Sequence, residues 1–550
     1  MKKVHIFLLV VFSLITFFAN RAALPTDIME SRNIVTAREI VSDRCWLVPT
    51  MNGELRLEKP PLPTWVAAGI EEVCPDNLAA QRTAAGVMGC VWTLYLFLLV
   101  RYISRRDELA AATVLVYLTC YNVVLMGRSA TWDIYCHAFM MGAIYYLTRA
   151  LYDGTDEKKQ RRNWQWFALA GVFMGLSFLS KGPVSFYTLL LPYLITLIGL
   201  PSPQMKGKWK PLFVMVVITL AIGSWWYIYL LTEHPTEVSA VIHKESGAWS
   251  NHNVRPWWYY WRFFLEMGAW AILMVAALVL PYWKRHISLK REYLFAITWA
   301  IGSLILLSLM PEKKTRYLLP SLAPCSMVVG CLIVHFTKTD KLDKVSKLLY
   351  IINGLTISVI VVALPTLIYH FGVRSGMVSI RTDIVATVFM LFLAGWLVWN
   401  TLQWHPFRFT AGIAGLFVFA EIFLLGAIGY TFGNHQAHSI SAVRTDKRVN
   451  SLPFYHNAAE PLRIELVYEA NRKILPLNLN DRQAVRAAMP FVLVSQHWTR
   501  EEILPDILSD IDTISIGTFD DNKHPRSDSH YTSAFINHVT ILKQKENEQN

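Results

Sequence analysis

Apolar stretches long enough to cross a lipid bilayer recur along most of this chain, and they constrain its fold more than any other feature. About thirteen such segments follow from the rule that roughly 20 apolar residues span the hydrocarbon core. They lie at residues 4–22, 83–101, 109–126, 133–150, 165–180, 183–200, 211–232, 260–281, 293–310, 318–336, 348–370, 383–401 and 410–431. The sequence therefore predicts an α-helical polytopic membrane protein, with a transmembrane domain at residues 1–432.

The composition agrees with this class and excludes two others. Hydrophobic residues make up 54% of the chain and charged residues 17%, against about 25% charged residues in soluble domains. The same figures exclude an intrinsically disordered chain. The first apolar segment follows Lys2 and Lys3, and we interpret it as an uncleaved anchor; the alternative is a signal peptide cleaved near Ala19 or Ala23.

The net charge of +12 is explained by the positions of the lysines and arginines. They are concentrated in alternate loops that are in phase with Lys2 and Lys3, such as residues 101–106, 149–162 and 284–291. The positive-inside rule therefore predicts a cytoplasmic N-terminus and a C-terminus on the opposite side. Basic residues interleaved with aromatic ones do not form a nucleic-acid-binding module anywhere in the sequence, so we expect no nucleic-acid partner.

Two predicted outer segments are large. Residues 21–82 form a proline-punctuated first outer loop, with helical periodicity at 27–42. Residues 433–550 predict a small extracytoplasmic α/β domain. Its expected strands and helices lie at 462–468, 490–495 and 514–518, and at 480–488 and 499–510, respectively. Cys45 and Cys74 both fall in the first outer loop, where a disulfide is chemically allowed.

Ionisable residues gather on the outer side of this topology, which was derived from other residues. They are Glu30, Arg32, Glu58, Lys59, Asp133, Lys181, His252, Arg255, Lys313, Lys314 and Tyr317. Any one of them alone is best explained as an ordinary loop charge. As a set, acids, bases and a histidine at membrane depth indicate a shared polar cavity, because such groups are costly there and usually functional.

Each group has a structural alternative. Glu58 and Lys59 precede a proline-rich stretch that would hold them stiffly, or they belong to a solvated loop. Asp133, taken alone, is better explained as a helix N-cap or first-turn acid. His252 lies beside an aromatic interfacial run; paired with an acid such as Glu58, it could hold a divalent metal.

The segment MPEKKTRYLLP contributes the remaining polar groups. Lys313, Lys314, Arg316 and Tyr317 either cradle a phosphate or snorkel to the membrane surface. Cations and carboxylates together at the outer membrane face suit a lipid-linked phosphate substrate. The cations would stabilise a phosphate leaving group, and a carboxylate would activate an acceptor hydroxyl.

Several motifs resemble the GT-C membrane glycosyltransferases, most closely the lipid A aminoarabinose (4-amino-4-deoxy-L-arabinose) transferases and the protein O-mannosyltransferase-like proteins. The motifs are MESRNIVTAREI, WLVPTMNGELRLEKPPLPTW, RSATWDIY, LSKGP, the loop ending in RPWWYY, and KKTRYLLP. The resemblance implies a bacterial inner-membrane enzyme with about thirteen spans and an outward active site. It also implies a C-terminal extracytoplasmic domain and an undecaprenyl-phosphate-linked sugar donor.

The resemblance also implies roles for individual residues. Glu58 matches a metal-binding acid with His252 as its partner, the metal being Zn, Mg or Mn. The phosphate-contacting positions fall on Lys59, Arg32 and Tyr317, with a looser match at Arg255 and a further cation at Lys313. Asp133 matches the acid of the second outer loop.

One departure from the family pattern concerns the expected catalytic base. The family shows Asp-Glu-x-Arg in its first loop, whereas this chain has Met29-Glu30-Ser31-Arg32. Glu30 is then the candidate for the base, because its side chain reaches one methylene further than an aspartate; Asp27 is a poorer candidate.

We therefore expect a glycosyltransferase that moves a sugar from undecaprenyl phosphate to lipid A or a related glycolipid on the periplasmic side. Transfer to a protein or glycan hydroxyl is the alternative acceptor chemistry. A lipid-linked sugar transporter would place its polar groups at the bilayer midplane within broken helices. Here the polar residues lie at the ends of the spans, which favours an enzyme over a transporter; a sensor or scaffold would leave these residues dispensable.

Overall fold

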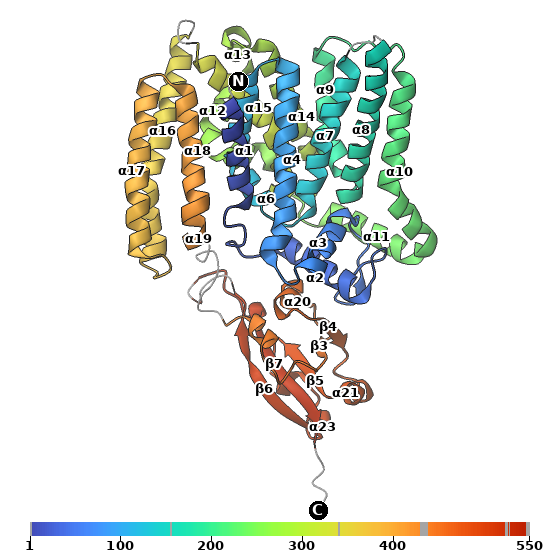
Figure 1. The fold of residues 1–550 in the computed structure, drawn as a ribbon. Coiled ribbons are helices and arrows are strands. Elements are labelled where there is room, and N and C mark those ends of the chain that lie inside the picture. Colours follow the sequence, from blue (N-terminus) through green and yellow to red (C-terminus); the bar gives the residue numbers. More distant parts are fainter. Residues whose placement is uncertain are drawn as a thin grey trace, which may run out of the picture. The chain divides into compact units, whose positions relative to one another are not determined.

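The computed structural model describes residues 3–153, 157–338, 342–428, 438–522, 526 and 528–545. The chain is mostly helical and forms two compact units, each coloured along the sequence in Figure 1. The first unit comprises Met1–Arg21, Leu57–Pro63 and Ala79–Ala427. The second comprises Ala22–Arg56, Thr64–Leu78 and Ile428–Asn550.

The first unit is a bundle of helices in a multi-pass membrane protein. Its α-helices are α1 (Lys3–Phe18), α4 (Leu78–Ser104), α5 (Asp107–Leu118), α6 (Tyr121–Met126), α7 (Trp132–Tyr152), α8 (Glu157–Lys181), α9 (Leu191–Thr196), α10 (Trp209–Glu233), α11 (Pro235–Asn251), α12 (Ala271–Ala277), α13 (Leu280–His286), α14 (Lys290–Leu309), α15 (Leu322–Phe336), α16 (Lys344–Ile368), α17 (Ile380–Leu402), α18 (Pro406–Phe419) and α19 (Leu425–Ile428). The 3₁₀- and π-helical segments are η1 (Phe186–Leu190), η2 (Leu197–Gly199), η3 (Trp257–Trp270), η4 (Thr315–Ser321), η6 (Tyr369–Val373) and η7 (Ala420–Leu424).

The number of clear membrane spans is smaller than the sequence indicated. Within the described residues, seven helices are long and apolar enough to cross a membrane, or up to eight if the bent pair Trp257–Ala277 and Leu280–His286 is one span. The predicted count of about thirteen is therefore not confirmed. Helix α1 and the segment Phe186–Gly199 are shorter than a full span, and α5 stops at Leu118. Helices α7 and α8 carry polar and charged residues that lower their hydropathy.

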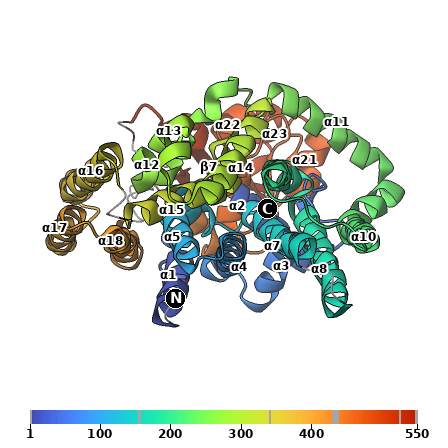
Figure 2. The ribbon, with the colours of Figure 1, turned by 90° about the horizontal axis from the view of Figure 1, so that it is seen from above.

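Helix α15 lies at the centre of the first unit. Every one of its residues from Leu322 to Phe336 is buried, and it packs against α5 and α14. Figure 2 shows two flanking groups, α16 with α17 and α18, and α7 with α8 and α10. Exposed apolar side chains on α17, such as Val388 and Phe392, form the kind of surface that contacts lipid.

The second unit is built around a five-stranded mixed sheet with the strand order β4-β3-β5-β7-β6. Strands β3 (Phe454–Asn457), β4 (Ile474–Leu477) and β5 (Phe491–Ser495) are parallel, and β7 (Ile536–Gln544) is antiparallel to β5 and to β6 (Ile511–Asp520). A second, two-stranded sheet pairs β1 (Thr50–Met51) with β2 (Glu54–Leu55). The helical elements are α2 (Ile28–Asp43), α3 (Leu62–Val73, whose first two residues belong to the first unit), α20 (Ile464–Ala470), α21 (Arg482–Ala488), α22 (Thr499–Glu502), α23 (Pro505–Leu508), η9 (Ile440–Arg444) and η10 (Ser533–Phe535).

The core of the second unit joins the first outer loop to the C-terminal segment. Ile34 and Val35 of α2 share one buried cluster with Val467 and Tyr468 of α20 and with Phe454 of the sheet. The helix predicted at 27–42 is confirmed as α2, which starts at an Asp27 N-cap. The C-terminal segment therefore does not bury its apolar residues alone.

One strand prediction in this unit is wrong. Residues 462–468 were expected to be a strand, but Ile464–Ala470 form helix α20. Parallel strands β3 and β4 need a crossover between them, and a helix supplies it. Ile464, Val467 and Tyr468 then lie three and four residues apart on one buried helix face. The strands expected at 490–495 and 514–518 are confirmed by β5 and β6.

The two cysteines of the first outer loop are thiols in this structure. Cys45 is half-buried and Cys74 is exposed, and neither forms a disulfide.

Candidate functional site

A buried ion pair joins the start of α7 to the end of α8. Asp133 lies in the first turn of α7, as its structural alternative predicted. Its carboxylate pairs with the ammonium of Lys181, the last residue of α8, and the two side chains are only 4% and 9% exposed. Helix α8 ends there because Gly182 adopts a positive φ of 68° before Pro183. The end of the helix in LSKGP thus places the Lys181 ammonium beside a buried carboxylate.

Tyr317 lies among three cations. The Lys181 ammonium is 5.4 Å from the centre of the Tyr317 ring, the Arg316 guanidinium is 5.8 Å away and the Lys314 ammonium is 6.0 Å away. These distances are within the range of cation–π attraction. The Tyr317 hydroxyl donates a hydrogen bond of 3.3 Å to Glu312, which also pairs with Lys314 at 2.5 Å. We call Asp133, Lys181, Arg316, Tyr317 and Lys314 the cation cluster.

The loop that carries His252 and Arg255 pairs with the loop just before Tyr317. Val254 forms an antiparallel bridge with Glu312, and the Arg255 amide donates to the Pro311 carbonyl at 3.4 Å. The Lys313 amide donates to the Asn253 carbonyl at 3.1 Å. Two predicted motifs that are about sixty residues apart in the chain are therefore neighbours, which no local pattern in either motif indicates.

Lys313 has a structural role in this arrangement. Its side chain is 5% exposed, and its ammonium donates to the carbonyls of Met310 and Pro311 at the end of α14. Burial lowers the pKa of Lys313. Lys313 thus gives the carbonyl of Met310, the residue that caps the end of α14, a donor, and it shares the Pro311 carbonyl with the Arg255 amide. The phosphate contact predicted for Lys313 stays a prediction, and its ammonium would have to leave these carbonyls to make it.

Glu58 and Lys59 each face a residue of opposite charge on α11. The Glu58 carboxylate lies 3.6 Å from the Lys244 ammonium, and the Lys59 ammonium lies 3.7 Å from the Glu245 carboxylate. Neither Lys244 nor Glu245 was predicted as a site residue from the sequence. The only available signal was the reversed order of the charges, Glu-Lys at 58–59 and Lys-Glu at 244–245.

Glu30 and Arg32 belong to the first turns of α2 in the second unit. The Glu30 side chain is 1% exposed, and its amide donates to the Asp27 carboxylate at 2.7 Å. Asp27 is thus engaged as the N-cap of the helix, which agrees with its poorer standing as a base. Arg32 is half-buried on the same helix. The roles of base for Glu30 and of phosphate contact for Arg32 stay predictions.

The predicted metal pair does not by itself make a complete ligand set. In the described part of the chain, no group of three or more histidine, cysteine, aspartate or glutamate side chains is arranged to hold a metal ion. The Glu58 carboxylate lies beside the Lys244 ammonium, and His252 is exposed. Protein metal sites ordinarily collect three or four such donors, so Glu58 and His252 would not complete a metal site by themselves.

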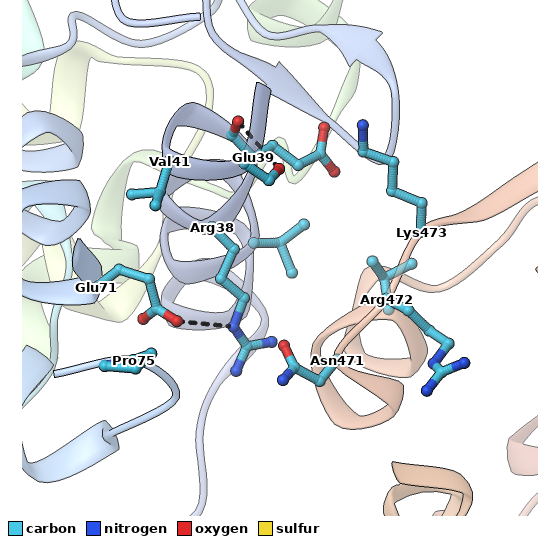
Figure 3. Close-up of a pocket in the computed structure, with 11 residues that line it drawn as sticks. Arg38, Glu39, Val41, Glu71, Pro75, Asn471, Arg472 and Lys473 are labelled. Carbon is cyan, nitrogen blue, oxygen red and sulfur yellow. Dashed lines mark hydrogen bonds and ion pairs between the residues drawn. The ribbon is translucent and has the colours of Figure 1, made fainter. Parts of the chain in front are cut away.

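A cavity of about 370 Å³ lies in the second unit, between α2, the end of α3 and the residues around α20 and β4 (Figure 3). The Arg38 guanidinium points toward the Glu71 carboxylate at 3.8 Å, and it also pairs with Asp76 at 2.5 Å. Lys473, another residue of the lining, pairs with Asp43 at 2.5 Å. Through this contact Lys473 lowers the pKa of Asp43, and Asp43 raises the pKa of Lys473 against the lowering effect of burial. The cavity therefore has compensated charges, and none of the predicted site residues lines it.

Comparison with known proteins agrees with the resemblance drawn from the motifs. Residues 58–228 match the family described as dolichyl-phosphate-mannose-protein mannosyltransferase. The chain is 25% identical over 389 residues to an undecaprenyl phosphate-alpha-4-amino-4-deoxy-L-arabinose arabinosyl transferase of Pseudomonas fluorescens, covering 68% of this chain and 64% of that protein. It is 26% identical over 353 residues to the corresponding transferase of Shewanella sediminis, covering 62% of this chain and 61% of that protein. The matches thus span slightly less than two thirds of the length of these relatives.

The fold is also shared with a solved structure. The crystal structure of ArnT from Cupriavidus metallidurans bound to undecaprenyl phosphate superposes with a TM-score of 0.69 and 15% identity, covering 98% of this chain and 97% of that one. At this identity the likeness establishes the fold. Together with the matched family and relatives, it confirms the resemblance to GT-C transferases of the aminoarabinose and mannosyltransferase-like type.

Proposed function

We infer that this chain, which shares the ArnT fold and resembles the mannosyltransferase family, is a membrane glycosyltransferase that takes its sugar from an undecaprenyl-phosphate-linked donor. The observation that carries this proposal is the cation cluster at the outer ends of α7 and α8. Three cations around one tyrosine, anchored on a buried carboxylate, suit an anionic head group held at a membrane surface.

The proposed reaction is an inverting displacement. An acceptor hydroxyl attacks the anomeric carbon of the sugar, and the bond from that carbon to the phosphate oxygen breaks. Its electron pair leaves with undecaprenyl phosphate, and Glu30 accepts the hydroxyl proton as general base. Cations that stabilise charge developing on the phosphate lower the barrier, a role we assign to Lys59, Arg32 and Arg255, with Tyr317 as a hydrogen-bond donor.

Asp133 has an indirect role in the proposed reaction, through Lys181. Its carboxylate is held by Lys181, so we propose that it positions the Lys181 ammonium beside Tyr317. A divalent metal at Glu58 and His252 is part of the same proposal. When bound, it would supply further positive charge beside the donor phosphate.

For substrates, we propose transfer of 4-amino-4-deoxy-L-arabinose to lipid A. The sugar follows the names of the relatives, which specify 4-amino-4-deoxy-L-arabinose on undecaprenyl phosphate. Met29 replaces the aspartate of the family motif, so a protein or glycan hydroxyl is the second acceptor candidate. The non-enzymatic alternative is a lipid-linked sugar transporter.

The number of membrane crossings and the sides on which the two termini lie are part of the same proposal. Helices α1, α5, α7, α8 and α9 would add five crossings to the eight already counted, which gives the predicted thirteen. With the basic loops in the cytoplasm of a bacterial inner membrane, the N-terminus is cytoplasmic. The α/β segment from residue 433 onward is then periplasmic.

Mass spectrometry of lipid A and other glycans from cells with and without the gene tests the function. Lipid A should gain the mass of one sugar when the gene is present. Lys59→Ala should lower the transfer rate by a factor of about 10²–10³. Glu58→Gln should abolish detectable transfer. Both variants should insert normally into the membrane. Glu54→Gln, an exposed acid four residues away, is the matched control and should retain activity. Full activity of Lys59→Ala and Glu58→Gln would refute the enzyme.

A further inference from the structure

Helix α11 is attached to the Glu58-Lys59 motif by charge rather than by apolar packing. The Lys244 and Glu245 side chains are 73% and 51% exposed, although both pair with the motif. A side chain built at Gly247, two residues further along, would meet nothing within 4 Å. Figure 2 shows α11 at the rim of the helices, continuing from α10. The two ion pairs are thus a principal link between this part of α11 and the motif.

Links of this kind are weak and exchangeable. The partner on α11 is exposed in each pair, although Glu58 and Lys59 are only 16% and 25% exposed, and water and salt screen such pairs. An anion that reaches the Lys59 ammonium therefore competes with the Glu245 carboxylate, because the interaction it replaces is weak. The phosphate of a lipid-linked donor is such an anion, and the proposed function brings it to Lys59.

We propose that α11 is a charge-held gate, in which the Glu245 carboxylate occupies Lys59 in the free protein and yields it to the phosphate of the lipid-linked donor. This inference rests on the proposed function and adds two residues to it. Glu245 competes with the donor, and it displaces the undecaprenyl phosphate product when it returns to Lys59. Lys244 lies one residue away on the same helix, so its ammonium adds to the positive potential that the phosphate meets.

The two residues therefore have opposite effects on phosphate binding. Removing the Glu245 charge takes away a competitor, whereas removing the Lys244 charge takes away an attraction. A purely structural role for α11 would make both substitutions act in the same direction. This difference in sign separates a gate from a helix that only supports the fold.

The experiment measures binding of undecaprenyl phosphate to the full-length protein in nanodiscs, together with steady-state sugar transfer. Glu245→Gln should lower the Kd for undecaprenyl phosphate and the KM for the donor by about two- to fivefold. Lys244→Gln should raise both by a similar factor. Each difference from the wild type should shrink as the salt concentration rises, because screening weakens exposed charges.

Two control variants accompany these measurements. Glu245→Asp keeps the charge and should behave like the wild type. Glu237→Gln makes the same chemical change in the first turn of α11, at an exposed acid for which the described part of the chain shows no ion pair, and should leave the Kd unchanged.

The outcomes separate this inference from the proposed function. If the wild type binds undecaprenyl phosphate and Glu245→Gln binds it no more tightly, the gate is refuted and the transferase stands. If Glu245→Gln and Lys244→Gln both weaken binding, α11 has a structural role and the gate is again refuted. If the wild type neither binds undecaprenyl phosphate nor transfers sugar, the proposed function fails and the gate with it.

Discussion

The ion pair between Asp133 and Lys181 makes the sharpest stability prediction of this structure. Both side chains are almost completely buried, so neither charge can be hydrated once its partner is removed. Lys181→Met and Asp133→Asn should each destabilise the protein, whereas Asp133→Asn combined with Lys181→Met should be close to the wild type. The reason is that a buried pair costs little to remove as a whole and much to break.

The expected size of each loss follows from the neighbours that remain. Breaking a buried pair costs about 3–5 kcal/mol in general. After Lys181→Met, Asp133 is still attracted electrostatically by Arg316, so we expect the free energy of unfolding to fall by about 3 kcal/mol. After Asp133→Asn, the Lys181 ammonium still lies 5.4 Å from the centre of the Tyr317 ring. This contact offsets roughly 1–2 kcal/mol of a loss that would otherwise be about 5 kcal/mol.

The assay is denaturation of the purified protein in mixed micelles, with a double-mutant cycle over the two positions. A coupling energy of about 6 kcal/mol is expected, because a double variant close to the wild type recovers both single losses of about 3 kcal/mol. The control is the pair of Arg101 and Asp107, which has a distance of 2.7 Å but an arginine side chain that is 55% exposed. Asp107→Asn should cost less than about 1 kcal/mol. If the losses at Asp133 and Lys181 simply add in the double variant, the pair is not energetically coupled and the reasoning is wrong.

Three further predictions test separate parts of the molecule. Lys313→Ala should lower the free energy of unfolding by about 1–3 kcal/mol, because the Met310 carbonyl loses its Lys313 donor, and should leave the donor KM unchanged; a raised KM without a stability loss would instead support a phosphate contact. The metal predicted at Glu58 and His252 should copurify with the wild type and be lost from His252→Ala, as measured by elemental mass spectrometry; wild-type protein without metal contradicts it. Burial raises the pKa of Asp521, so the folded state loses stability as the pH rises from about 3.9, the unfolded value, through the folded pKa. Asp521→Asn should therefore slow hydrogen exchange in β6 at neutral pH and flatten this pH dependence; faster exchange at neutral pH would refute the assignment.

Sequence patterns located most of the elements, because helices and buried strands have periodic apolar residues. The helix at 27–42 and the strands at 490–495 and 514–518 were found in this way. The segment 462–468 was misassigned as a strand, since a short apolar run has no clear period and only the crossover between parallel strands requires a helix there. The count of about thirteen spans is not confirmed, because several of the helices that the structure forms at these segments are too short, or too polar, to count as membrane spans by length and composition.

The candidate site shows the same division. Its residue types could be found from sequence, because cations and acids at the ends of apolar spans are unusual and because several motifs resemble a known family. Their partners could not. Whether Asp133 faces Lys181, whether Lys313 faces a phosphate or a helix end, and which residue faces Lys59 depend on chain segments far away in the sequence.

The sequence alone thus determined that this chain is a polytopic membrane protein, and it predicted which ionisable residues share one membrane face, because hydropathy and loop charge are properties of single segments. Tertiary structure alone decided which charges meet. Ion pairing depends on distances of a few ångströms between segments that lie far apart in the sequence, about 190 residues for Lys59 and Glu245. Electrostatic energy falls with distance and with exposure to water, so the same residue types become a buried anchor at Asp133 and an exchangeable contact on α11.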